Sequence, residues 1–183
     1  MGISIKLEGI GEVDVMLRQL ASEIGDKETN SKILIPAVRK AFQPVLATAQ
    51  QLAPKETGAL ALSLQVEARR PTSADRRSKY VTRTDTVIAA VTTASGKKMA
   101  AMSEGKGLLR SQRRLRKMGH ADLAENFKGF TSDARAIAQE FGSARNPQHS
   151  YLRPALEARS QETVNELASI LKDRILQYRS KMR

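Results

Sequence analysis

Residues 52–66, with the sequence LAPKETGALALSLQV, decide the fold because they contain the end of a helix, a turn and a strand. Pro54 disfavours the helical conformation at the residue before it, so a helix is expected to end at Ala53. The pair Thr57-Gly58 predicts a turn in which Gly58 has a positive φ. Beyond the turn, apolar residues alternate with small or polar ones, which predicts a strand with one buried face. The alternating residues are Leu60, Leu62, Leu64 and Val66.

A long helix is predicted before this stretch, over Ser31 to Ala53, because apolar residues recur there at every third or fourth position. Asn30 or Ser31 can cap its start, and Pro36 falls in the first turn, where no backbone hydrogen bond is lost. Pro44 removes an internal hydrogen bond and is expected to kink the helix or divide it.

The N-terminal residues predict one further strand and one further helix. Residues 3–8 alternate apolar and polar side chains, as a half-buried strand does. Residues 12–24 follow a helical period, and Gly25 is expected to end that helix.

After the first strand, residues 69–83 are polar and basic and contain Pro71, so they predict a long loop. Residues 84–93 are rich in Thr, Val and Ile and predict a second strand, which we expect to pair with the first as an antiparallel hairpin. Residues 136–141 fit either a strand or a short helix.

A last helix is predicted from Pro154 nearly to the end of the chain, with basic residues near its C-terminus that suit the helix dipole. Its apolar stripe consists of Leu156, Val164, Leu167, Leu171, Ile175 and Tyr178. We expect the long helix and the last helix to pack together on one face of the sheet. The side chains expected to meet are Val38, Val45 and Ala49 with Val164, Leu167 and Leu171.

These elements predict an α+β fold: a small, mostly antiparallel sheet packed by two long helices, with a basic, Gly-rich insertion. A chain of 183 residues has the length of one domain, so we expect a single domain over 1–183. Within it, residues 95–132 are expected to form an inserted arm or lid outside the core. Gly96 and Gly129 stand near its two ends and would let it move as a unit.

The formal charge of +12, from 31 Lys and Arg against 19 Asp and Glu, favours acidic surfaces, nucleic-acid phosphates or anionic lipid as partners. The densest basic stretch is 106–117, where one helical face carries the candidate contacts to DNA or to an acidic partner. The contacts are Arg110, Arg113, Arg114 and Lys117. The opposite face is apolar and would dock onto a neighbouring subunit; it consists of Leu108, Leu115 and Met118. The alternative interpretation is an ordinary solvated helix face.

No catalytic constellation emerges from the sequence. Without Cys the chain has no disulfide, thiolate nucleophile or Cys-ligated metal, and His120 and His149 lack carboxylates at metal-ligand spacing. The spacing around Gly105 and Gly107 does not form a phosphate-binding fingerprint. Glu140 has no carboxylate partner for acid–base work and is expected to hydrogen-bond the local backbone. We therefore expect no enzyme activity, no cofactor and no metal.

Three segments together resemble the tail-component family of long-tailed bacteriophages, also called tail-completion or head–tail joining proteins. The first signature is Ala53-Pro54-Lys55-Glu56-Thr57-Gly58-Ala59-Leu60. The second signature is Glu140-Phe141-Gly142-Ser143, and the third is Tyr151-Leu152-Arg153-Pro154-Ala155-Leu156. Residues 69–132, which include the insertion 95–132, lie largely outside the resemblance.

The resemblance implies a structural virion protein of the head–tail junction that is assembled in the host cytoplasm. It implies that copies of the chain form a ring, which is six-fold by analogy with the tail axis. The ring would contact tail-terminator, tail-tube or head-closure proteins and would surround DNA that it binds non-specifically. No membrane partner is expected. The signature residues are expected to specify the fold, with Phe141 buried before a turn at Gly142 and Pro154 starting the last helix. They are Pro54, Thr57, Gly58, Leu60, Glu140, Phe141, Gly142, Arg153 and Pro154. A small basic nucleic-acid-binding accessory protein is the alternative.

Overall fold

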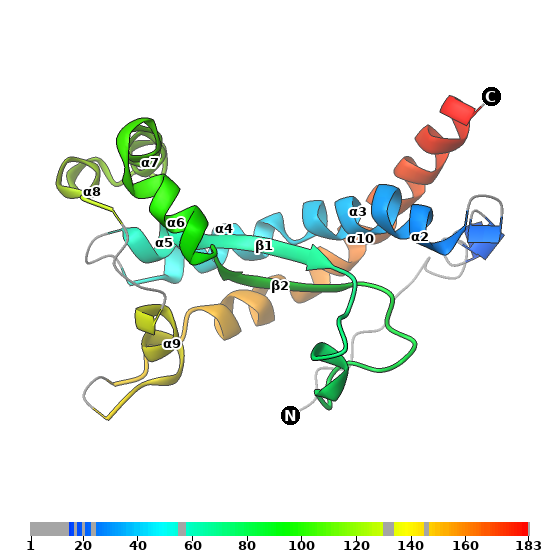
Figure 1. Ribbon diagram of the computed structural model, residues 1–183, viewed down its shortest axis with the longest axis horizontal. Coiled ribbons are helices and arrows are strands. Elements are labelled where there is room, and N and C mark those ends of the chain that lie inside the picture. Colours follow the sequence, from blue (N-terminus) through cyan, green and yellow to red (C-terminus); the bar gives the residue numbers. More distant parts are fainter. Residues whose placement is uncertain are drawn as a thin grey trace. The chain divides into compact units, whose positions relative to one another are not determined.

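The computed structural model describes residues 15–16, 18–19, 21–22, 25–54, 58–129, 134–144 and 147–182 (Figure 1). The predicted strand over 3–8 and Thr57 lie outside these residues. In chain order the elements are α2 (Asp26–Thr29), η1 (Asn30–Leu34), α3 (Ile35–Ala41), α4 (Gln43–Leu52), α5 (Ala59–Ser63), β1 (Leu64–Arg69), η2 (Asp75–Arg77), β2 (Ile88–Thr93), α6 (Gly96–Ser103), α7 (Gly105–Lys117), α8 (Ala121–Asn126), α9 (Ala134–Phe141) and α10 (Leu152–Met182).

The α+β prediction is confirmed: the described residues are mostly helical, β1 and β2 form a two-stranded antiparallel sheet, and the last element is the long helix α10. Contacts gather in two compact units within the chain. The first unit consists of Met1–Pro44, Val66–Ala90 and Arg159–Arg183, and the second of Val45–Gln65 and Val91–Ala158. We describe each unit by itself.

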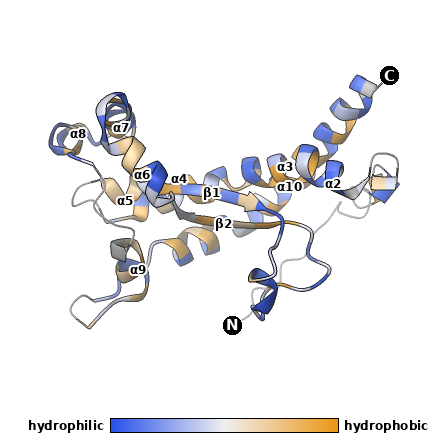
Figure 2. Cartoon of the chain, viewed as in Figure 1, coloured by the Kyte–Doolittle hydropathy of each residue, from blue (hydrophilic) through white to orange (hydrophobic). Residues whose placement is uncertain are grey.

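In the first unit, the predicted packing between the long helix and the last helix is confirmed, and Figure 2 shows hydrophobic residues on both helices. The contact set differs from the prediction, because Val38 is only half-buried and Val45 and Ala49 belong to the second unit. Of the contacts predicted on the last helix, Leu167 and Leu171 are in the cluster and Val164 is not. The buried residues of this cluster are Ile33, Ala37, Ala41, Ile170, Leu171 and Ile175, with Leu167 packed beside them. Arg39 of α3 also donates a hydrogen bond to the Ala68 carbonyl of β1, at 3.3 Å.

The long helix begins earlier than predicted, at Asp26 rather than Ser31. Gly25, with φ +84°, ends the preceding helical turn as expected, and its carbonyl accepts the N–H of Thr29 at 3.1 Å. Because Pro36 has no N–H, the regular ladder cannot pass through it. The chain widens there into a π turn, in which the N–H of Ile35 bonds the carbonyl of Asn30.

The division predicted at Pro44 is confirmed, since α3 ends at Ala41, with Phe42 as its C-cap, and α4 begins at Gln43. Pro44 thereby falls in the first turn of α4, where its missing N–H breaks no hydrogen bond. The helix then ends at the first signature, as Pro54 predicts.

The strand predicted from Leu60 is wrong over its first four residues, which belong to the short helix α5. Ala and Leu are strong helix formers, and the N–H of Leu62 bonds the Gly58 carbonyl at 3.1 Å. The strand begins at Leu64, and β2 begins at Ile88 rather than at residue 84. The predicted antiparallel hairpin across a long basic loop is confirmed.

Residues 134–141 form the helix α9, which settles the alternative between strand and helix. The last helix starts at Leu152, with Pro154 in its first turn as predicted. Leu156 does not belong to the buried stripe, because it is exposed while Ala155 beside it is fully buried.

Candidate nucleic-acid interface

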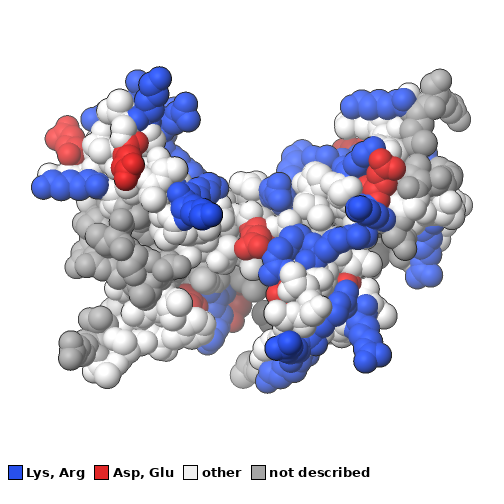
Figure 3. Space-filling view, in the orientation of Figure 1, with Lys and Arg blue, Asp and Glu red and all other residues white. Residues whose placement is uncertain are grey.

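Helix α7 carries the basic stripe predicted from the sequence. Residues three and four apart lie on one helical face, so the four candidate contacts form a continuous line along α7. All four side chains are exposed, and none pairs with another described residue: Arg110, Arg113, Arg114 and Lys117. Figure 3 shows Lys and Arg gathered on the part of the surface that α7 forms. This face presents positive charge that no carboxylate of the described residues neutralises.

The opposite face of α7 is anchored in the second unit. Leu115 is fully buried and packs with Leu62, Ala124 and Phe127. Ser111 is buried as well, and its hydroxyl donates to the carbonyls of Met102 at 2.9 Å and Gly107 at 3.1 Å. The basic stripe therefore stands on a helix whose position is fixed by packing and by hydrogen bonds.

Two glycines permit this packing. A Cβ at Gly107 would lie 1.9 Å from the carbonyl oxygen of Ala101, so only Gly lets α7 approach α6 this closely. Gly58 has the predicted positive φ, +65°, and a Cβ there would lie 2.5 Å from Cδ2 of Leu115. The first signature thus lies directly against the helix that carries the basic stripe.

The prediction of an arm or lid outside the core is wrong for the helices α6 to α8. Leu115, Ala124 and Phe127 are at most 2% exposed to solvent and belong to the hydrophobic cluster of the second unit. Leu108 and Met118 pack against the same cluster, so the chain itself covers the apolar face expected to dock on a neighbouring subunit. Of the two glycines expected to act as its hinges, Gly129 is a close-packing point, since a Cβ there would meet the Ser103 side chain at 2.7 Å, whereas a Cβ at Gly96 would meet nothing within 4 Å.

The second and third signatures meet in space. The Glu140 carboxylate is buried and accepts the backbone N–H of Tyr151 at 2.8 Å, of Leu152 at 2.9 Å and of Arg153 at 3.4 Å. These are free donors at the start of α10, so Glu140 caps that helix and its negative charge faces the positive end of the helix dipole. The prediction of a backbone-bonding Glu140 is correct in kind, but its partners lie on another element.

Phe141 is the signature residue whose predicted burial is wrong, since 66% of it is exposed. On α9, Ala136 and Glu140 are one turn apart and point inward, so Ile137 and Phe141 point to solvent. Gly142 follows with φ +77° and makes the predicted turn. The buried aromatic residue is instead Tyr151. Burial raises the pKa of the Tyr151 hydroxyl to about 12, and the nearby negative charge of Glu140 makes a smaller contribution in the same direction.

The remaining signature residues have local roles. Pro54 follows the end of α4 and Gly58 caps the start of α5, in which Leu60 is half-buried. Arg153 and Pro154 are exposed in the first turn of α10.

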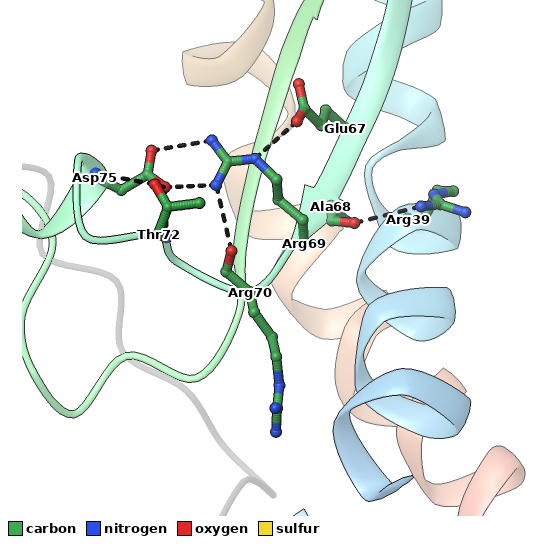
Figure 4. A network of polar contacts seen from close by, with 7 residues as sticks. All are labelled: Arg39, Glu67, Ala68, Arg69, Arg70, Thr72 and Asp75. Atoms are coloured by element: carbon green, nitrogen blue, oxygen red, sulfur yellow. Dashed lines mark hydrogen bonds and ion pairs between the residues drawn. The ribbon is translucent and has the colours of Figure 1, made fainter. Parts of the chain in front are cut away.

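The composition of residues 69–83 predicted a long basic loop between β1 and β2 but not the polar network that orders it in the first unit (Figure 4). Both terminal nitrogens of the Arg69 guanidinium group, Nη1 and Nη2, donate to the Asp75 carboxylate, with an Nη2–Oδ1 distance of 3.0 Å. The third nitrogen, Nε, donates to Glu67 at 2.7 Å. Hydrogen bonds from Arg69, and then from Thr72, hold the pKa of Asp75 well below its ordinary value. The spacing Thr72-x-x-Asp75 resembles a capping box and was the available signal for this order.

No helix among the described residues is both long and apolar enough to cross a bilayer. In the same residues, no three His, Cys, Asp or Glu side chains gather closely enough to hold a metal ion. The backbone of His120 bonds Leu115, whereas that of His149 bonds Gln139. Comparison with known proteins gives no match, since no protein-family model, curated protein or solved structure is significantly similar to this chain.

Proposed function

We propose that this chain is a structural virion protein of the neck or tail of a long-tailed bacteriophage. In this proposal it completes the tail end and joins tail to head as an oligomeric ring around the DNA channel. It contacts further copies of itself and an adjacent tail-terminator, tail-tube or head-closure protein. The DNA that passes through the ring is contacted without base reading.

The observation that carries the proposal is the contact between the second and third signatures. Glu140 of one signature holds the first backbone donors of the other, from Tyr151 to Arg153, although the two are separate in the sequence. Their order and their joint role in starting α10 support a shared fold rather than a chance match of short motifs.

The basic stripe supports the part of the proposal that concerns DNA. Exposed Arg and Lys side chains attract phosphates without reading the bases, and such diffuse charge suits DNA that must move through a channel. The stripe lies on a helix fixed by Leu115 and Ser111, so its charges have a constant position on the subunit.

A small basic nucleic-acid-binding accessory protein is the second candidate. The net charge of +12 favours it equally, whereas the ordered signatures do not. The two candidates differ in assembly, because a neck protein acts as a ring and an accessory protein acts on DNA alone.

The test is sedimentation and electron microscopy of the purified full chain, followed by mixing with tails that lack it. The proposal predicts rings, or monomers that become rings on the tail end and restore joining to heads. A lasting monomer that leaves tails unchanged and binds DNA tightly and sequence-specifically contradicts it and supports the second candidate.

The role of the stripe is tested with Arg113→Gln combined with Arg114→Gln, in the same joining reaction. The matched control is Lys172→Gln with Lys181→Gln, which removes two exposed charges from α10. We expect loss of joining in the stripe variant and normal joining in the control. Equal joining by both variants would make the stripe an ordinary solvated face.

A further inference from the structure

The loop between β1 and β2 contains a pocket of about 350 Å³ that lies wholly within the first unit. Three arginines line it: Arg70, Arg76 and Arg83. Its volume is within the range of about 300–1,000 Å³ that small-ligand pockets occupy. One carboxylate, that of Asp85, also lines the pocket, so the charge of its lining is positive.

The carboxylates of the loop are already engaged. Asp75 is held by Arg69 and Thr72 outside the pocket lining. Asp85 accepts the backbone N–H of Thr82 at 2.8 Å, and hydrogen bonds from Thr82 lower its pKa. The charge of Arg76 also lowers the pKa of Asp85. These carboxylates therefore fix the loop and leave Arg70 and Arg83 without an anionic partner among the described residues.

One arginine of the pocket braces the loop and two are free to bind. Arg76 donates to the carbonyls of Thr82 and Asp85, the latter at 3.2 Å, which closes the loop while the guanidinium keeps its charge. Arg70 and Arg83 have no hydrogen bond or ion pair from their side chains to any described residue. Figure 4 shows the Arg70 side chain pointing away from the Arg69 network.

The chemistry of the lining favours a phosphate over a carboxylate. Guanidinium groups match the oxygens of either anion, but a tetrahedral phosphate accepts hydrogen bonds from several directions at once. The hydroxyl-bearing residues Thr84 and Thr86 add donors to the same pocket. Arg77 and Lys79 are exposed on the same loop, where they can meet the next phosphates of an extended polyanion.

We propose that this pocket binds the phosphodiester backbone of double-stranded DNA, with Arg70 and Arg83 as the contacting residues and Arg76 as a positioning residue. This site is separate from the α7 stripe and belongs to the other unit. It does not depend on the neck function, because it concerns DNA binding by the chain itself.

The experiment measures binding of a fluorescently labelled duplex of mixed sequence to the full chain over a series of salt concentrations. The logarithm of the affinity falls linearly with the logarithm of the salt concentration, and each lost phosphate contact makes this negative slope shallower by about 1. We therefore expect Arg70→Gln combined with Arg83→Gln to make the slope shallower by about 2. The melting temperature, measured by circular dichroism, should not change. The control, Lys172→Gln with Lys181→Gln, has the same net charge and should keep the wild-type slope. Equal loss in both variants would mean that binding follows net charge only and would overturn the site.

A second variant separates a built pocket from simple attraction. Asp75→Asn raises the net charge by one but breaks the contact that orders the loop. If the ordered loop forms the binding site, this variant should bind the duplex more weakly than the wild type. Tighter binding would show that net charge, and not an ordered pocket, determines the affinity. Polyglutamate at equal charge concentration should compete poorly with the duplex. Competition as strong as that of unlabelled DNA would assign the pocket to an acidic protein surface instead.

Binding by the isolated chain and ring assembly are separate readouts. Failure of the salt-slope test leaves the rings on tails unaffected, and failure to form rings leaves DNA binding by Arg70 and Arg83 in place. The two proposals therefore fail distinguishably.

Discussion

The carboxylate of Glu140 accepts the backbone N–H of Tyr151 at 2.8 Å, across a separation of 11 positions in the sequence. This contact joins the end of α9 to the start of α10. It places a negative charge where the first N–H groups of a helix lack partners within the helix. Tyr151 is itself 1% exposed, so the capped turn is part of the interior of the second unit.

Glu140→Gln is expected to destabilise the protein by about 1–3 kcal/mol, because the hydrogen bonds donated to the carboxylate lose their charge assistance and the negative charge at the helix dipole is removed. Urea unfolding followed by circular dichroism measures the change. The matched control is Glu125→Gln on the exposed face of α8, which should change the stability little. Equal effects of the two substitutions would show that the cap does not contribute.

Gly58→Ala is expected to destabilise more than Gly119→Ala. Both glycines have a positive φ, which for a residue with a Cβ costs roughly 1–2 kcal/mol. At Gly119 the added Cβ meets nothing within 4 Å, whereas at Gly58 it lies 2.5 Å from the Leu115 side chain. Thermal melts of the two variants give the difference, and equal melting temperatures would contradict the close approach.

Leu115→Ala is expected to cost about 2–5 kcal/mol, as truncation of a fully buried leucine usually does. Leu109→Ala on the same helix should change stability by less than about 0.5 kcal/mol, because that side chain is 55% exposed. Denaturant unfolding distinguishes the two. A helix α7 that is not part of the core would give the same small effect at both positions.

Alkaline pH should destabilise the second unit through Tyr151. Its pKa is raised from 10.0 to about 12 in the folded protein, so the folded state holds the proton more tightly than the unfolded state. The raised pKa therefore contributes to the free energy of unfolding below pH 10, and this contribution is lost as the pH rises towards 12. Its size is on the order of 2 kcal/mol. Tyr151→Phe should remove this part of the pH slope. Tyr80→Phe, at a 79% exposed side chain, should keep the wild-type slope, and a flat slope in the wild type would refute the burial effect.

Residue type and apolar periodicity predicted several features of the fold. The break near Pro44, the positive φ of Gly58 and the contact of the long helix with the last helix all follow from local patterns. The short helix at Ala59–Ser63 was missed because its alternating Leu and Ala residues fit a strand as well as a helix. The packing of Leu62 against Leu115 is a tertiary contact that the local pattern does not contain.

The contacts that the sequence could not predict link residues across loops. Glu140 finds its partners beyond a turn, and Arg69 finds Asp75 within a stretch whose composition predicts only a polar loop. The basic stripe was identified correctly as an exposed face, because the spacing of Arg110, Arg113 and Arg114 fixes it locally. The destination of its apolar face depended on tertiary contacts and was predicted wrongly.

The central claim, that this chain is a structural protein of a phage neck or tail, is tested most directly by immunogold electron microscopy. Antibodies raised against the full chain are applied to intact virions of the phage that encodes it, with virions that lack the protein as control. The account predicts gold label at the junction of head and tail, and none on the control particles. Virions without label, while the protein is abundant in the infected-cell lysate, would contradict it.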